Sequence, residues 1–264
     1  MELDAARAVV LRPGEGETIF DRLERTIRIL ADFDQLAVTW FRYEPGQEGP
    51  PPHVHKRHTD AFYVLEGALE LGLGPDVTRM TGAAGTFAAA PPNVVHTFRN
   101  GSDATVVFLN IHAPNMGFAE MLRAARDGRR GNAEEFDQFE PPADGGRPLS
   151  DAVFRGQGEG APIMTGERAA VLRAEGSDVG GFFSLAEMIL APSFQAPLVT
   201  RDGAPVSGFY VLEGTLSLRL GDERIEARSG DFALAPAGTA RTFANVGGES
   251  VRMLELMAPS ASST

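Results

Sequence analysis

Apolar and polar residues alternate with a period of two in several short stretches of this chain. The clearest are 68–73 (ALELGL) and 215–220 (TLSLRL), each flanked by glycine-containing turns. Residues 104–112 (ATVVFLNIH) and 250–257 (SVRMLELM) are β-branched or apolar runs of strand length. Turn residues recur about every eight to twelve positions, which is the spacing of a β-sandwich or barrel. The pattern predicts an all-β fold.

Two segments have a helical pattern when each is read alone. Residues 20–30 (FDRLERTIRIL) have a counterpart in 165–176, where Gly166 and Gly176 enclose a short extended segment, so we predict strands for both. Residues 115–128 differ, because their apolar side chains fall on one helical face, with Asn115 as a predicted N-cap and Gly128 as a stop. The residues of that face are Phe118, Met121, Leu122 and Ala125. We predict a helix that closes the open side of a barrel, followed at 129–160 by a linker crossing the surface.

The chain repeats itself at an offset of 144 to 147 residues. The sequence FYVLEG occurs at 62–67 and again at 209–214. Residues 85–100 (GTFAAAPPNVVHTFRN) parallel 230–245 (GDFALAPAGTARTFAN) in the same way. We therefore predict three parts: an N-terminal barrel at 1–115, a helix and linker at 116–154, and a C-terminal barrel at 155–264.

Residues able to bind a metal are concentrated in the first repeat. His53 and His55 are two apart, so on a strand both imidazoles project from one face. A turn at 56–59 would let Asp60 return a carboxylate to the same place, and His96 opens a later strand. Three imidazoles and one carboxylate form a typical site for a divalent metal with open positions.

Two motifs carry a resemblance to a known family. The first is Gly49, His53-x-His55, Asp60 and Gly67; the second is Gly85, Pro91-x-Asn93, His96 and Asn100. At these spacings they resemble the two motifs of the cupin superfamily, and because both repeats are covered the chain looks like a bicupin of the quercetin dioxygenase type. The resemblance implies two double-stranded β-helix barrels of the jelly-roll class, with His53, His55, Asp60 and His96 as metal ligands.

The motifs depart from the family pattern at two positions. The carboxylate position usually holds Glu, and Asp60 is one methylene shorter, so it would bind directly after a backbone shift, bind through water, or leave a three-histidine site. Asn93 replaces a glycine, and because asparagine tolerates left-handed backbone geometry we expect the turn to form.

Other residues near the motifs have open roles. His58 lies in the predicted turn, either as a surface residue or as a substitute ligand or proton shuttle. His112 aligns with Met257, which favours a packed structural position. Phe62, Val64 and Phe98 share strand faces with the ligands, so they are candidates for the substrate pocket or for ordinary core.

The second repeat lacks the ligand set. The offset assigns Thr200 to His53, Asp202 to His55, Ser207 to Asp60 and Arg241 to His96. An arginine at the fourth position would repel a cation, so we predict no metal there. If Asp202 and Arg241 both point inward, we expect them to pair, because an isolated buried charge is costly. The predicted role of this barrel is stability and packing as a pseudo-dimer with the first; the alternative is an anion pocket around Arg241.

Composition narrows the classes of partner. The formal net charge of −12 argues against nucleic acid and anionic membranes as partners. The absence of cysteine excludes disulfides and thiolate ligands. The basic residues are arginine except for Lys56, which is typical of a GC-rich bacterial genome. No signal-like leader and no long apolar run occur in the sequence, so we expect a cytoplasmic protein.

These observations lead to a functional prediction. The site suits one divalent transition metal (Fe, Mn, Ni, Zn, Co or Cu), and no organic cofactor is expected. The resemblance implies a quercetinase-like dioxygenase or other oxidoreductase acting on a small molecule, with Asp60 as general base. A metal-dependent isomerase, lyase or hydrolase and a non-enzymatic ligand-binding protein are the alternatives. The chain would be a monomer or a homodimer.

Overall fold

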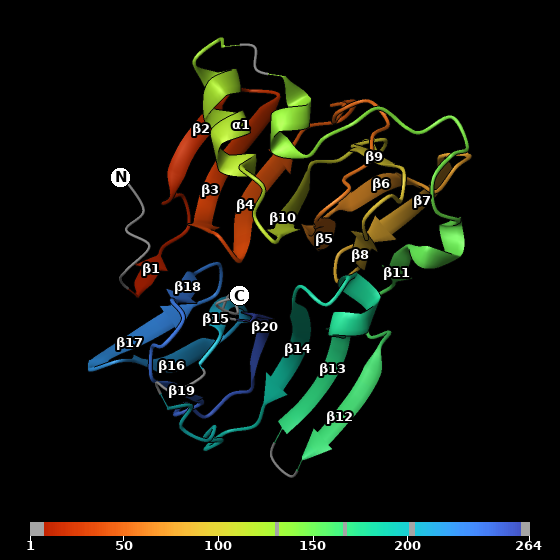
Figure 1. The fold of residues 1–264 in the computed structure, drawn as a ribbon. Helices are drawn as coiled ribbons and strands as arrows, with labels where there is room; N and C mark the ends of the chain where they lie inside the picture. The colour runs from red at the N-terminus through yellow and green to blue at the C-terminus, as the bar shows by residue number, and fades with distance from the viewer. Residues whose placement is uncertain (1–7, 130–131, 166–167, 201–203, 260–264) are drawn as a thin grey trace. The chain divides into compact units, whose positions relative to one another are not determined.

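The protein consists of two units rich in antiparallel β-strands (Figure 1). The computed structural model describes residues 8–129, 132–165, 168–200 and 204–259. Within them, Gly16–Gly158 and Ser177–Phe182 form the first unit, and 8–15, 159–176 and 183–259 form the second. The all-β prediction is confirmed, with one α-helix among the described residues. None of the described helices is both long and apolar enough to span a bilayer.

The first unit contains a seven-stranded and a three-stranded sheet. Its elements are β2 (Glu17–Asp21), β3 (Arg25–Phe33), β4 (Leu36–Tyr43), β5 (Thr59–Glu66), β6 (Ala68–Leu73), β7 (Thr78–Ala83), β8 (Phe87–Ala90), β9 (His96–Arg99), β10 (Val106–Ala113), α1 (Phe118–Arg126), η1 (Ala133–Phe136), η2 (Leu149–Asp151) and β11 (Val153–Arg155). The larger sheet has the order β11-β8-β5-β10-β4-β3-β2, and the smaller has the order β7-β6-β9.

The second unit repeats this arrangement. Its strands are β1 (Val9–Leu11), β12 (Ala161–Thr165), β13 (Arg168–Ala174), β14 (Ser184–Leu190), β15 (Val206–Glu213), β16 (Thr215–Leu220), β17 (Glu223–Arg228), β18 (Phe232–Ala235), β19 (Arg241–Ala244) and β20 (Val251–Ala258), with a 3-10 turn η3 (Gly176–Val179). The strand orders are β1-β18-β15-β20-β14-β13-β12 and β17-β16-β19, which match the first unit element by element.

One edge strand of each large sheet comes from the other repeat. Strand β1 opens the first repeat but pairs with β18, with Val9 opposite Leu234. Strand β11 precedes the second repeat but pairs with β8, with Val153 opposite Ala89. The compact units therefore divide the chain differently from the sequence repeats, and the boundaries predicted at 115 and 155 remain predictions about the repeats.

The identical FYVLEG sequences end in the same turn for the same reason. Gly67 and Gly214 have φ angles of 71° and 84°, a left-handed conformation that favours glycine. A Cβ atom at Gly67 would lie 2.3 Å from the carbonyl oxygen of Thr105, and one at Gly214 would lie 3.0 Å from that of Ser250. The turn therefore requires glycine in both units.

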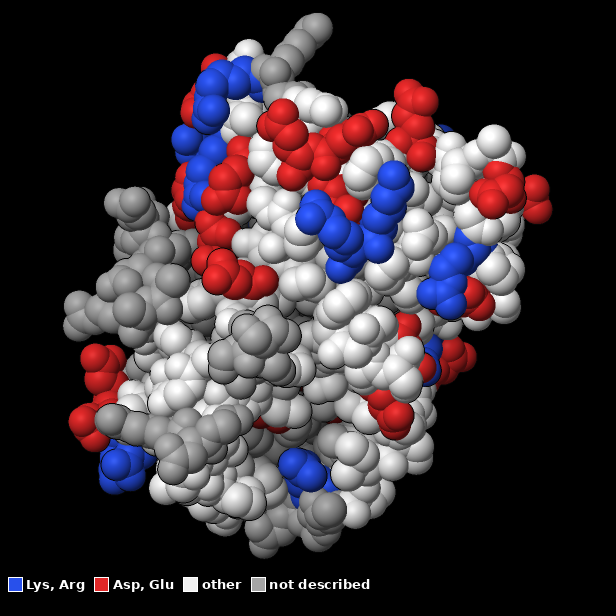
Figure 2. Space-filling model, viewed as in Figure 1, with Lys and Arg blue, Asp and Glu red and all other residues white. Residues whose placement is uncertain are grey.

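The predictions for the two helix-like segments are confirmed. Residues 20–30 fall in β2 and β3, and 115–128 contain α1. The side chain of Asn115 accepts hydrogen bonds from the backbone N–H groups of Gly117 and Phe118, at 3.1 and 3.2 Å. Arg123 fixes the helix to the sheet through ion pairs with Glu17 (2.7 Å) and Asp32 (2.8 Å). Acidic and basic side chains also lie next to one another over the first unit on the face shown in Figure 2.

The interiors of the two units are filled differently. In the first, Phe41 stacks on Phe108 with ring centroids 5.0 Å apart, and Phe98 packs edge-on against Phe108 at 5.5 Å. In the second, buried methionine and leucine side chains surround Phe209 and Phe243 in one apolar cluster. Hydrophobic burial stabilises both units, and both also bury ionisable groups, but all the buried histidines lie in the first.

Candidate metal centre and cavity

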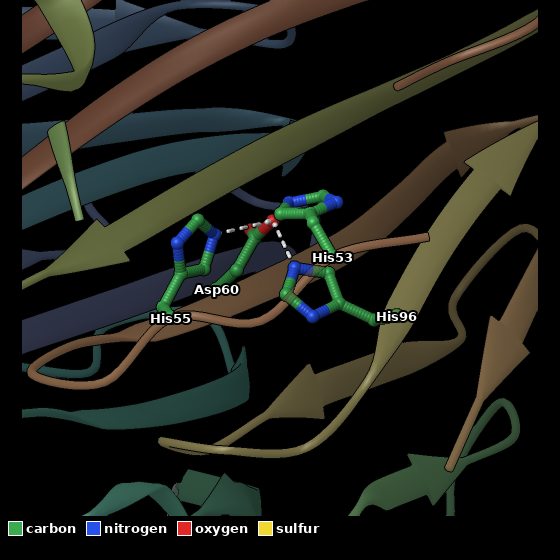
Figure 3. A group of neighbouring side chains, drawn as sticks. All are labelled: His53, His55, Asp60 and His96. Atoms are coloured by element: carbon green, nitrogen blue, oxygen red, sulfur yellow. Dashed lines mark ion pairs between the residues drawn. The ribbon is translucent and has the colours of Figure 1, made fainter. Parts of the chain in front are cut away.

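The four predicted ligands lie together inside the first unit (Figure 3). His53 and His96 face each other through two backbone hydrogen bonds of 3.1 and 2.9 Å. Asp60, near the start of β5, places Oδ2 3.2 Å from His96 Nε2 and 3.9 Å from His55 Nε2. One coordinating atom from each of the four residues lies within 4.8 Å of the others, and all four side chains are buried.

The hydrogen bonds of the three imidazoles show that the site fits a metal ion. In each ring, Nδ1 donates to a backbone carbonyl oxygen, which can only accept, so Nδ1 carries the proton and Nε2 keeps its lone pair. These bonds join His53 to Pro51 (2.9 Å), His55 to Asp137 (2.8 Å) and His96 to Val94 (3.0 Å). Nε2 of His55 and of His96 is buried without a hydrogen-bond partner. A metal would satisfy these lone pairs, which are otherwise costly to bury.

The charges of the site also suit a divalent cation. Burial, reinforced by the neighbouring His96, lowers the pKa of His53 to about 3. Burial likewise places the pKa of His55 well below its ordinary value. Burial opposes ionisation of Asp60, but the imidazoles of His112 and His96 outweigh it and lower the pKa of Asp60 to about 2. At neutral pH His53 and His55 are therefore neutral and Asp60 is a carboxylate, and imidazole with carboxylate is a ligand set typical of transition metals.

Asp137 supports the site from a segment predicted to be only a surface linker. It follows η1, has a φ of 58°, and is fully buried. Its carbonyl oxygen holds His55, as described above. Its carboxylate accepts from the backbone N–H groups of Lys56 (3.2 Å) and Arg57 (2.8 Å) and from Arg57 Nε (3.1 Å). Asp137 thus fixes both a predicted ligand and the turn that follows it.

The prediction that His58 lies on the surface is wrong. His58 is 1% exposed, because the carboxylate of Asp137 covers the turn and accepts a hydrogen bond of 2.9 Å from His58 Nδ1. His58 Nε2 lies 2.9 Å from His112 Nδ1, and His112 Nε2 lies 3.1 Å from the side-chain oxygen of Asn110. Asn110 in turn donates its amide to Asp60. A continuous hydrogen-bonded chain therefore joins Asp137 to Asp60.

The hydrogen bonds of this chain require one proton more than two neutral imidazoles carry. Three hydrogen bonds, from Asp137 through two imidazoles to the Asn110 oxygen, need three protons, whereas two neutral imidazoles carry only two. Burial lowers the pKa of His112 to about 3, so this ring is neutral at neutral pH. His112 is buried as predicted, with its ring stacked on Phe118 at 3.7 Å.

A cavity of about 290 Å³ is lined by three of the four predicted ligands, His53, His55 and Asp60. Its walls are largely apolar, and all four α1 residues predicted to share a helical face line it, so the helix covers this side of the barrel as predicted. Phe98 lines the cavity, but Phe62 and Val64 do not belong to its walls. Phe62 instead packs behind Phe98, with ring centroids 5.1 Å apart, and Val64 is buried in the core.

The strand register corrects one of the equivalences expected for the second unit. Ser207 is opposite Met257 on β20 as Asp60 is opposite His112 on β10, so that assignment holds. Val199, however, is bridged to Arg241 as His53 is bridged to His96. Thr200 is therefore shifted by one residue from the His53 position, because the repeats differ in length just before it. Asp202 lies outside the described residues, and with it the predicted pairing to Arg241.

A different pair of opposite charges occupies the interior of the second unit. Arg241 is 2% exposed and Glu255 is 9% exposed. Glu255 takes the register position that Asn110 has in the first unit. Burial lowers the pKa of Arg241 and raises that of Glu255, and the attraction between the two charges opposes both shifts. Among the described residues here, neither Val199 nor Ser207 offers a strong metal ligand.

Comparison with protein families supports two copies of one domain in this chain. The family model described as Cupin domain matches residues 39–112 and 186–257, which together are more than half of the chain. The quercetin 2,3-dioxygenase of Bacillus subtilis (strain 168) is 30% identical over 104 residues. That match covers 39% of this chain and 30% of the relative, so it spans less than a third of the relative's length.

Solved structures share the fold along nearly the whole chain. A putative glyoxylate-induced protein from Pseudomonas aeruginosa superimposes with a TM-score of 0.67 at 18% identity, covering 95% of this chain and 88% of its own. Protein Ylba from E. coli gives a TM-score of 0.67 at 15% identity, with 97% and 93% covered. A variant of oxalate decarboxylase from Bacillus subtilis gives 0.62 at 15% identity, with 95% and 77% covered. At such identities the likeness shows the fold alone.

Proposed function

This chain belongs to the cupin domain family, with two copies of the domain, and from that premise we propose that it is a metal-dependent dioxygenase of the quercetinase type. The observation that carries the proposal is the convergence of His53, His55 and His96 Nε2 lone pairs on the Asp60 carboxylate, beside an apolar cavity. The sequence likeness to a quercetin 2,3-dioxygenase supports the same class of reaction.

In this proposal the three imidazoles and Asp60 hold the metal. When bound, a redox-active transition metal would supply a centre at which an enol-type substrate and dioxygen react. The backbone carbonyls behind the imidazoles keep every ring in one tautomer and orientation. The apolar cavity walls exclude water from the reacting groups, which strengthens the electrostatic interactions among them.

Asp60 is the proposed general base toward the substrate hydroxyl. Its Oδ1 accepts a hydrogen bond from the side-chain amide of Asn110, and its Oδ2 lies near His96 Nε2 and His55 Nε2. A carboxylate whose pKa is about 2 retains a proton poorly, so it would return a proton taken from the substrate to the product. The hydrogen-bonded side chains of Asn110, His112 and His58 link Asp60 to Asp137 and hold the Asp60 carboxylate in one orientation.

Oxygen uptake tests the proposal. The full chain, loaded separately with Fe(II), Mn(II), Ni(II) and Co(II), would be mixed with quercetin and with smaller enediol compounds in an oxygen electrode. We expect substrate-dependent oxygen consumption with at least one metal, abolished in His96→Ala and retained in Arg241→Ala, its counterpart in the second unit. No consumption with any metal would contradict the dioxygenase and favour an isomerase, a lyase or a binding protein.

A further inference from the structure

Arg25 places a guanidinium group in the wall of the cavity that three of the predicted metal ligands also line. It is the first residue of β3, and its guanidinium carbon lies 4.6 Å above the ring centroid of Phe20, another cavity residue. This contact is a cation–π interaction, which fixes the direction of a long side chain without neutralising its charge. The cavity therefore has an oriented cation in an otherwise largely apolar wall.

No carboxylate of the described chain forms an ion pair with Arg25. By contrast, Arg42 on the adjacent strand β4 forms an ion pair with Glu44. Nε of Arg25 is buried without a hydrogen-bond partner. The cavity also borders Glu48, but that side chain is 65% exposed and pairs with Arg99 at 3.4 Å. The guanidinium interacts with the phenol of Tyr43, but it has no carboxylate partner among the described residues, so its charge is available to an anion in the cavity.

Aromatic rings connect Arg25 with the predicted ligands. Arg25 is opposite Tyr43 in the β3–β4 ladder, and the ring of Tyr43 lies 6.0 Å from that of Phe98. Phe98 is two residues from His96 along β9, a rise of about 7 Å. Burial raises the pKa of Tyr43 to about 12, so its phenol is neutral and does not serve as the counter-ion of Arg25.

We propose that Arg25 binds the carboxylate of a small aromatic substrate whose hydroxyl end lies at His53, His55, His96 and Asp60. The proposal rests on the proposed function for the position of the reacting end, and it adds the substrate class. A cavity of about 290 Å³ is at the lower limit of the roughly 300–1,000 Å³ found for small-molecule sites, which favours a compound with one ring over a three-ring flavonol. The aromatic side chains between the two ends would contact the ring of the substrate.

Binding of a matched pair of probes tests the inference without turnover. The probes are 4-hydroxycinnamate and the neutral 4-hydroxycinnamamide, titrated calorimetrically into the full chain, both metal-free and zinc-loaded. We expect the wild-type chain to prefer the acid, and Arg25→Gln to bind it roughly 10- to 100-fold more weakly with little change for the amide, because a charge-assisted hydrogen bond is lost. Arg25→Lys should fall between the two, since it keeps the charge but loses the planar fork.

Arg28→Gln is the matched control. Arg28 lies on the same strand, but its guanidinium rests over Trp40 at 5.3 Å and it does not line the cavity. Equal affinity of the wild-type chain for acid and amide, absence of acid binding, or equal effects of Arg25→Gln and Arg28→Gln would overturn the inference. Circular dichroism shows whether Arg25→Gln is folded; if this variant does not fold, the ratio of acid to amide affinity of Arg25→Lys decides. Acid binding through Arg25 without oxygen uptake would contradict only the proposed dioxygenase.

Discussion

The two units have the same strand order and the same glycine turn, yet their interiors hold different chemistry. In the first, the buried carboxylate of Asp60 is surrounded by imidazoles. In the second, Glu255 and Arg241 are opposite charges, and Met257 replaces His112. Duplication has thus preserved hydrogen-bond register while the side chains that project inward have changed. Fold and site are separable properties of this chain, and the family alone does not decide what either barrel does.

The comparison is sharpest in the response to pH, because all five histidines lie in the first unit. The pKa of His53 and of His112 is lowered from 6.5 to about 3, so the unfolded chain takes up these protons at a higher pH than the folded chain. Stability is therefore lost as the pH falls below about 6.5, by about 2 kcal/mol for each histidine between pH 7 and pH 5.

Denaturant unfolding of the metal-free protein at several pH values measures this loss. Because the pKa of His55 is lowered as well, we expect His112→Asn to keep roughly two thirds of the pH dependence of the wild-type chain, and Arg241→Met to keep all of it. An unfolding free energy that is constant from pH 7 to pH 5 would contradict the assignment of neutral buried histidines to the first unit.

Ligand removal comes next in size. We expect His96→Ala to lower the affinity for zinc or manganese more than 100-fold, because each predicted ligand supplies a lone pair that water in an apolar cavity replaces poorly. Elemental analysis after dialysis at controlled free metal measures the effect. Arg241→Ala, at the matching position, should leave metal content unchanged. Equal metal content in His96→Ala and wild type would break the distinction between the two barrels.

A smaller effect is expected at Asp137. Asp137→Asn keeps the carbonyl that holds His55 and tolerates the left-handed backbone, but it removes the charge that orders His58 and Arg57. Loss of such support typically weakens metal binding 10- to 100-fold, and we expect about tenfold here because His55 keeps its bond. Competition with a chromogenic chelator measures the affinity, and unchanged binding would mean that only the backbone of this segment supports the site.

The smallest effect concerns the charges of the second unit. We expect Arg241→Met to lower stability by about 1 kcal/mol, because Glu255 loses its opposite charge. Adding Glu255→Gln should restore stability to near the wild-type value, since two neutral groups replace the pair. A thermal-unfolding double-mutant cycle measures this coupling. Additive losses in the double variant would show that Arg241 and Glu255 act independently.

The sequence allowed prediction of the features that recur or have regular spacing. The repeat predicted two barrels, and the motif spacing predicted the four residues that the structure brings together. The left-handed conformation of Asn93, with φ of 66°, was also predictable, because asparagine tolerates it at a turn. Each of these signals depends on local backbone geometry, which short sequence patterns encode directly.

Features created by distant contacts were not predictable in this way. Asp137 is 82 residues from His55, in a segment whose glycine, proline and acidic residues indicate only a linker. Without that contact, nothing marked His58 as buried. Thr200 was assigned to the position of His53 in place of Val199, because a constant offset cannot detect a one-residue change in length between the repeats. Arg25 looked like one of many arginines until the structure placed it in the cavity wall.

The edge strands β1 and β11, each paired with a strand of the other repeat, decide how this chain can be divided into fragments. A fragment ending at 115 would lack β11 and expose the edge of β8, and the complementary fragment would lack β1 and expose β18. Unpaired strand edges recruit other strands, so each half made alone is prone to aggregate. Two halves synthesised together as separate polypeptides would instead each hold the strand that the other needs, which makes this chain a natural starting point for a split-protein reporter.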